Sequence, residues 1–90
     1  MSDRIAEEIL RQTEARGPDK SICPSEVARA LDPEWQKLMT AVRRAAIRLA
    51  EQGRIDILRK GRPVPPDGVK GVIRLRLKPA PTEAPPSTKG

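Results

Sequence analysis

The sequence predicts a mainly α fold, in which three helices are followed by a two-stranded antiparallel hairpin. Three observations support this prediction. Apolar residues recur at helical spacing in three separate stretches before Gly53. Beyond Gly53 the spacing changes to the alternation typical of strands, in residues 55–58 and 73–78. Proline and glycine stand between these stretches, where they end helices and interrupt strands.

The first two predicted helices have recognisable ends. The first is expected to begin at Ser2, whose side chain can cap a helix, and to end before Gly17 and Pro18. The second is expected to begin near Pro24, because proline is favoured in a first helical turn. It is short and is expected to end around Asp32.

The third helix is the longest predicted element. Asp32 offers a capping oxygen and Pro33 suits the first helical position, so we expect one continuous helix from Pro33 to Gln52. At about 100° per residue, one face of this helix is apolar and should pack in the core. That face consists of Trp35, Leu38, Met39, Val42, Ala45, Ala46 and Leu49.

The two predicted strands are expected to be joined by a long basic loop. Apolar side chains recur at every second position of both strands, which is typical of antiparallel strands with one buried face. Residues 61–71 contain three prolines and three glycines, which should exclude regular pairing there. Arg74, Arg76 and Lys78 are expected on the exposed side, where they would keep a sheet edge soluble.

The composition is that of one small globular domain. The chain has 90 residues, of which 37% are hydrophobic and 33% charged. We expect residues 1–78 to form the domain and the proline-rich residues 79–90 to be a disordered tail. No apolar run approaches the roughly 20 residues of a membrane span, and the start lacks the pattern of a signal peptide. A cytoplasmic location without membrane contact is therefore expected.

Catalysis and metal binding find little support in the sequence. Cys23 is the only cysteine and there is no histidine, which excludes an internal disulfide and the usual zinc ligand sets. A thiol before a helix can be reactive, although a small buried residue is the commoner role of a lone cysteine. The acidic residues mostly fall in first helical turns, where the helix dipole explains them. We therefore expect neither an enzyme nor a bound cofactor.

The charge is concentrated in the middle of the chain. The formal net charge is +6, which favours a polyanionic partner. Residues 33–78 hold twelve basic and four acidic residues, whereas residues 1–32 carry a net charge of −2 and residues 79–90 are neutral. Such a separation is expected if one surface faces phosphate, but a simple solubility gradient would look the same.

The order of elements resembles that of the winged helix-turn-helix fold, over residues 3–78. In that fold the second and third helices form the helix-turn-helix, and the loop between the strands is the wing. More closely, four phrases resemble a small bacterial family of uncharacterised winged-helix domains. They are CPSEVARAL (23–31), PEWQKLM (33–39), GRIDI (53–57) and GVIRLRL (71–77). The resemblance implies the fold and names no activity, substrate or cofactor.

The outward face of the third helix is the predicted recognition surface. Arg44 and Gln36 are expected to read base edges in the major groove, and Lys37 and Arg48 to contact phosphates. Basic residues also commonly fill a solvated helix face, and Glu51 on the same face would repel phosphate. The predicted contacts of this helix are Gln36, Lys37, Thr40, Arg43, Arg44 and Arg48.

The loop between the strands is the second predicted contact. It carries Lys60, Arg62 and Lys70, with Arg59 beside them, and its prolines stiffen it. A stiff loop loses less conformational entropy than a flexible one when it docks on a nucleic-acid backbone. The prolines would equally serve to prevent pairing with a neighbouring molecule.

Duplex DNA is the predicted partner. Trp35 is the only aromatic residue, so the sequence lacks the stacking platform of a single-strand or RNA binder. The alternative is a protein-interaction module that docks on an acidic partner, which exposure of Ile47 and Leu58 would favour. The sequence contains no clear dimerisation helix, and the oligomeric state stays open.

Overall fold

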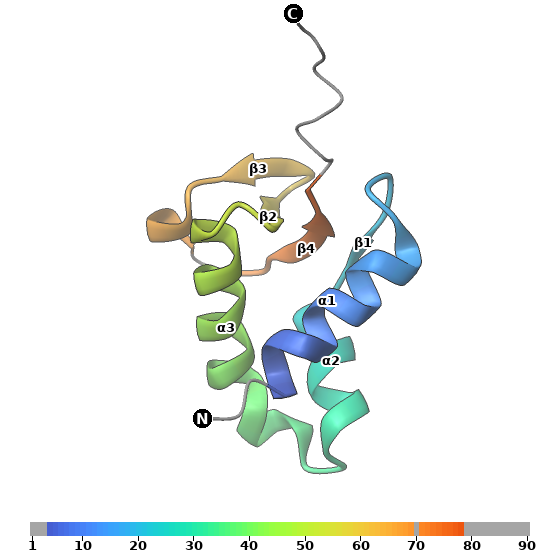
Figure 1. The fold of residues 1–90 in the computed structure, drawn as a ribbon. Coiled ribbons are helices and arrows are strands. Elements are labelled where there is room, and N and C mark those ends of the chain that lie inside the picture. Colours follow the sequence, from blue (N-terminus) through green and yellow to red (C-terminus); the bar gives the residue numbers. More distant parts are fainter. Residues whose placement is uncertain (1–3, 70, 79–90) are drawn as a thin grey trace, which may run out of the picture.

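The computed structural model of the chain describes residues 4–69 and 71–78 (Figure 1). Within them are three α-helices and two short 3₁₀-helices: α1 (Arg4–Arg16), α2 (Pro24–Leu31), η1 (Trp35–Leu38), α3 (Met39–Glu51) and η2 (Pro66–Gly68). Four strands form one antiparallel sheet: β1 (Ser21–Ile22), β2 (Ile55–Arg59), β3 (Arg62–Val64) and β4 (Arg74–Leu77). The predicted cap at Ser2 and the predicted tail 79–90 lie outside the described residues.

The sheet and the helices share one core. The strand order is β1-β4-β2-β3, and Figure 1 shows the helices packed on one side of this sheet. One residue from each strand lies in register across the sheet, in the order Ile22, Leu75, Ile57 and Val64. The first three are buried, and Val64 packs against the same cluster. The helices contribute the buried side chains Ile9, Val27, Ala28, Val42, Ala45, Ala46 and Leu49.

The C-terminal end of α3 is closed by a glycine, as the sequence predicts. Gly53 has a φ of +76°, a left-handed conformation that favours glycine. Its N–H donates to the carbonyl of Ala50, and the N–H of Arg54 donates to the carbonyl of Leu49, both at 3.0 Å. These two hydrogen bonds form a Schellman motif and satisfy carbonyls that the helix leaves unpaired. The motif turns the chain directly into β2.

The prediction of one continuous helix from Pro33 to Gln52 is wrong. Residues Trp35–Leu38 form the 3₁₀-helix η1, and the α-helix begins only at Met39. The physical reason lies at Asp32, whose Oδ1 accepts a hydrogen bond from the N–H of Glu34 at 2.8 Å. This local turn uses the oxygen that was expected to cap a helix. The carbonyl of Glu34 then accepts from the N–H of Lys37, which tightens the following turn.

The predicted antiparallel pairing of residues 55–58 with residues 73–78 is present between β2 and β4, but the prediction of only two strands with an unpaired loop over residues 61–71 is wrong. Arg62–Val64 pairs with β2, and Pro63 lies opposite Leu58. Proline is tolerated here because β3 is an edge strand, which pairs on one side only. The connection between β2 and β3 is therefore a two-residue turn. At the other edge, Ser21–Ile22 adds a fourth strand that the sequence analysis missed.

The basic residues of β4 do not line a sheet edge, contrary to the prediction. Strand β4 lies between β1 and β2, so neighbouring strands supply partners for its side chains. Arg74 donates to the Ser21 hydroxyl at 2.6 Å and to the Ser21 carbonyl at 3.0 Å. Arg76 donates to Asp56 at 2.9 Å. These contacts hold the outer face of the sheet together across three strands.

Leu75→Ala tests the importance of the central strand. The side chain of Leu75 is fully buried between Ile22 and Ile57, so truncation should lower the free energy of unfolding by about 2–5 kcal/mol. The measurement is urea denaturation followed by circular dichroism. Val72→Ala, at a position 84% exposed, is the control and should change that free energy by less than about 0.5 kcal/mol. Equal losses in both variants would contradict the assignment of the core.

Candidate nucleic-acid interface

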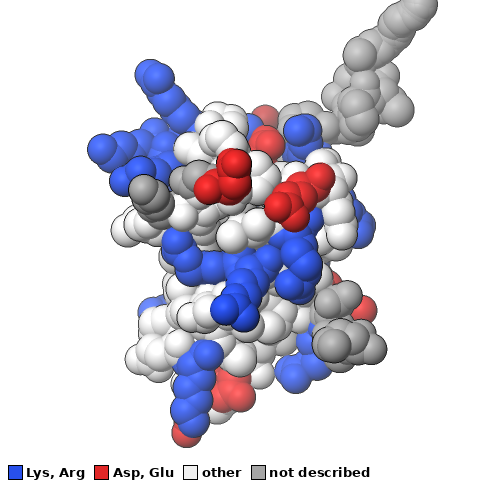
Figure 2. Space-filling view, turned by 90° about the vertical axis from the view of Figure 1, so that its left-hand side faces the viewer, with Lys and Arg blue, Asp and Glu red and all other residues white. Residues whose placement is uncertain are grey.

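Helix α3 presents polar side chains on its outer face. Thr40, Arg44 and Arg48 are exposed and recur at every fourth residue, which places them on one side of the helix. Glu51, in the last turn of α3, is exposed as well. Figure 2 looks onto the side of the molecule on which α3 lies. It shows basic side chains across the middle of this face and at its upper left corner, and acidic side chains above the middle group.

The β2–β3 hairpin forms a compact basic tip. Arg59 pairs with Arg62, so Lys60 and Gly61 are the two central residues of the turn. Their φ values are +54° and +81°, and positive φ at both positions is characteristic of a type I′ turn. Such a turn matches the twist of the strands, which makes the tip a defined structure. Three adjacent cations, Arg59, Lys60 and Arg62, are exposed there.

Some of these cations have no acidic partner in the part of the chain that the structure describes. No carboxylate within residues 4–69 and 71–78 forms an ion pair with Arg44, Lys60 or Arg62. The same holds for Arg59. Because their charge is not neutralised by these neighbours, it is available to a polyanion. We call these four residues the open cations.

Two predicted contact residues also make contacts within the protein. The ammonium group of Lys37 forms an ion pair with the carboxylate of Glu34, one turn earlier. Arg43 is half-buried, and its Nη1 donates to the carbonyl of Gly71 at 3.0 Å. The contact of Arg43 ties α3 to the chain segment that precedes β4. Arg43 therefore helps to position this segment, and its predicted contact with DNA stays a prediction.

The structure places part of the predicted site at exposed positions of α3 and of the hairpin tip. Thr40, Arg44 and Arg48 lie on α3 and Lys60 and Arg62 at the hairpin tip, all of them exposed. Gln36 and Lys37 are exposed on η1, outside the α-helical repeat that aligns the other three helical residues. Lys70 lies outside the described residues.

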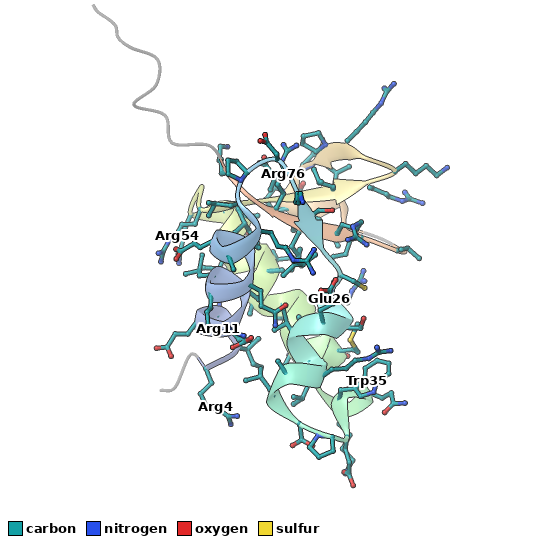
Figure 3. All side chains as sticks on the ribbon, turned by 90° about the vertical axis from the view of Figure 1, so that its right-hand side faces the viewer. Arg4, Arg11, Glu26, Trp35, Arg54 and Arg76 are labelled. Carbon is teal, nitrogen blue, oxygen red and sulfur yellow. The ribbon has the colours of Figure 1, made fainter. Side chains whose placement is uncertain are left out.

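On the rest of the surface, several charged residues pair with one another. Glu8 pairs with Arg11 along α1, and the hydrogen bond from Arg11 lowers the pKa of the Glu8 carboxyl. Arg16 pairs with Glu26 at 3.2 Å between α1 and α2. Figure 3 shows Arg11 on α1, on the side of the molecule away from the β2–β3 hairpin. The open cations thus differ in their surroundings from Arg11 and Arg16.

Trp35 and Cys23 both have intramolecular roles. The guanidinium carbon of Arg29 lies 4.6 Å from the centre of the Trp35 ring, a cation–π contact that joins α2 to η1. Figure 3 shows Trp35 at the end of the molecule opposite Arg76. Cys23 is half-buried before α2, and its sulfur accepts a hydrogen bond from Ser25 at 3.1 Å. The backbone N–H of Cys23 donates to the Glu26 carboxylate at 2.9 Å, which closes the start of α2.

Of the two side chains whose exposure would favour docking on a protein, one is buried and the other is partly buried. Leu58 is buried, with 6% of its surface exposed, and Ile47 is partly buried against the core.

Within the described ranges, no group of three His, Cys, Asp or Glu residues could hold a metal ion. None of the helices described is long and apolar enough to cross a membrane.

Comparison with protein families matches residues 2–78 to one family. Its description is "Protein of unknown function (DUF3253)". The match covers every described helix and strand. No curated protein matches the chain.

Arg43→Ala and Arg44→Ala form a matched pair that separates an internal contact from an open charge. Loss of the Arg43 hydrogen bond to Gly71 should lower the free energy of unfolding by about 1 kcal/mol and shift the amide resonances of residues 71–73. Arg44→Ala should change that free energy by less than about 0.5 kcal/mol, because Arg44 is exposed. Denaturant titration and amide spectra measure both effects. Identical spectra for the two variants would contradict the assigned role of Arg43.

Proposed function

The chain belongs to the DUF3253 family, whose description assigns no function, and we propose from its own residues that it binds duplex DNA. In this proposal the three helices and the sheet are a winged helix-turn-helix. Helices α2 and α3 are the helix-turn-helix, with α3 in the major groove, and the β2–β3 hairpin is the wing on the backbone. The role is binding, without catalysis.

The arrangement of the strands supports the winged-helix assignment. Strand β1 lies between α1 and α2 in the sequence and pairs with β4. The β2–β3 hairpin follows α3 directly and projects from the same sheet. Helix and hairpin are thereby parts of one packed unit, and their spacing is fixed before a ligand arrives. Such preorganisation reduces the entropy lost on binding.

The observation that carries the proposal is the set of open cations. Arg44 lies on the outer face of α3, and Arg59, Lys60 and Arg62 form the hairpin tip. Neutralisation of phosphates by such side chains releases condensed counterions, which is the main source of sequence-independent affinity for DNA. The proposed contacts on α3 are Thr40, Arg44 and Arg48, and those on the hairpin are Arg59, Lys60 and Arg62.

A duplex fits this surface better than single-stranded nucleic acid. Single-strand binders stack bases on exposed aromatic rings. Trp35 is the one aromatic residue of the chain, it is half-buried, and Arg29 lies over its ring. Exposed cations without a stacking platform suit the phosphates of a double helix.

The first test of this function is the salt dependence of binding. Random-sequence duplex DNA is titrated with fluorescently labelled protein at about 50 and 200 mM salt. If the four open cations each neutralise one phosphate, the slope of log affinity against log salt should be about −3.6, because each contributes about −0.9. The affinity should therefore fall about a hundredfold over this range. Absence of binding at the lower salt concentration would disprove the proposal.

Lys60→Asn is the variant that removes a contact with the least risk to the fold. Asparagine adopts a positive φ more readily than lysine, so the turn should keep its stability. The salt slope should fall in magnitude by about 0.9, and Arg44→Ala should have the same effect. Arg11→Ala, on α1 and away from the β2–β3 hairpin, is the control and should leave the slope unchanged.

Competition distinguishes DNA from an acidic protein as the partner. Polyglutamate of matched charge density serves as the competitor. Equal displacement of the bound duplex by polyglutamate and by unlabelled DNA would favour an acidic protein.

Glu51→Gln should strengthen binding. Glu51 is exposed in the last turn of α3, three residues beyond Arg48. Removal of one negative charge near the phosphates should raise the affinity about twofold at low salt and less at high salt, where the charge is screened. Glu14→Gln, exposed on α1, is the control and should have no effect. Weaker binding by Glu51→Gln would instead indicate that Glu51 contacts a base or holds an arginine.

A further inference from the structure

Among the described residues, Val72 is the large apolar side chain that is exposed to solvent, with 84% of its surface exposed. It follows Gly71 and precedes the buried Ile73, just before β4. A single exposed apolar residue is ordinary in a protein. The surroundings of Val72 distinguish it from such a residue.

The backbone on both sides of Val72 is held in place. The carbonyl of Gly71 accepts a hydrogen bond from Arg43 of α3 at 3.0 Å. The guanidinium of Arg59 also lies against Gly71, 3.7 Å from the position that a Cβ atom would take there. On the other side, Ile73 is 2% exposed and anchored in the core. The valine is therefore presented to solvent by a defined backbone.

Cations surround this valine. It forms part of the wall of two hollows in the surface. One, of about 400 Å³, is lined by Leu58, Arg59, Lys60, Gly61, Val72 and Arg74. The other, of about 220 Å³, lies toward α2 and α3 and includes Arg43 and Met39. A partner seated on Val72 would thus meet an apolar contact with positive charges on both sides.

We propose that Val72 packs against the sugar edge of the duplex, beside the phosphates held by the hairpin tip. This inference rests on the proposed function and adds an apolar contact to it. A deoxyribose presents apolar C–H groups between two negatively charged phosphates. This surface is complementary to an apolar valine with cations on both sides. A protein partner fits less well, because a stable interface buries about 800 Å² on each side and needs a larger apolar centre than one valine.

Val72→Ser tests the contact by removing apolar surface without changing charge. The affinity for duplex DNA should fall about three- to tenfold, which corresponds to part of the burial of one valine. The salt slope should stay at the wild-type value, because no counterion is released by an apolar contact. Val72→Ile should bind as the wild type does. Ala15→Ser, exposed on α1, is the control and should bind with unchanged affinity.

The outcomes separate this inference from the proposed function. If the wild-type protein does not bind duplex DNA at low salt, the proposed function fails and the Val72 contact fails with it. If the wild-type protein binds and Val72→Ser binds equally well, only the Val72 contact is overturned. A change of salt slope in Val72→Ser would also overturn it, since the substitution would then act through the neighbouring cations. Reduced affinity with an unchanged slope and an unchanged melting temperature supports it.

Discussion

The rest of the structure depends on the row of apolar side chains that crosses the sheet from Ile22 through Leu75 and Ile57 to Val64. Neither a two-residue strand nor an isolated hairpin is stable in water, so each strand relies on this shared burial against the helices. Strand β4 lies in the middle of the sheet, so Leu75 lies opposite Ile22 of β1 on one side and opposite Ile57 of β2 on the other. It thereby links the segment between α1 and α2 to the hairpin that follows α3. The same row therefore sets where the hairpin tip stands relative to α3.

Strong periodicity made most of the fold predictable. The three helical stretches and the alternation around Ile57 and Leu75 each span enough residues to show their period. The two-residue β1 is too short to show one, and its pairing depends on residues more than fifty positions away. Pro63 suggested an unpaired loop, because the edge position that tolerates proline is a property of the assembled sheet. The turn at Asp32 was missed because one carboxylate can serve either a cap or a turn.

The positive charge of the candidate interface was predictable from the sequence, but which residues form the interface was less predictable. Helical spacing places Arg44 outward, and the structure leaves it exposed. Arg43, its neighbour of the same type, binds a carbonyl 28 residues later in the chain, and no local pattern indicates that contact. Val72 lies before β4, outside the alternating residues 73–78, so the strand pattern does not predict its exposure. That cations lie on both sides of Val72 follows from the hairpin and from α3, and only the assembled fold brings these together.

The turn of the hairpin holds a lysine where glycine or asparagine is preferred. At a φ of +54°, Lys60 occupies the left-handed region, which costs a side chain about 1–2 kcal/mol relative to the right-handed one. Glycine at that position would avoid this strain, as Gly61 does at the next one. No carboxylate of the described residues pairs with Lys60, so no ion pair among these residues offsets the strain. Strain of this kind gathers at functional sites. A cation held at this strained position, between Arg59 and Arg62, does not add to the stability of the turn, and it fits the polyanionic partner that we propose.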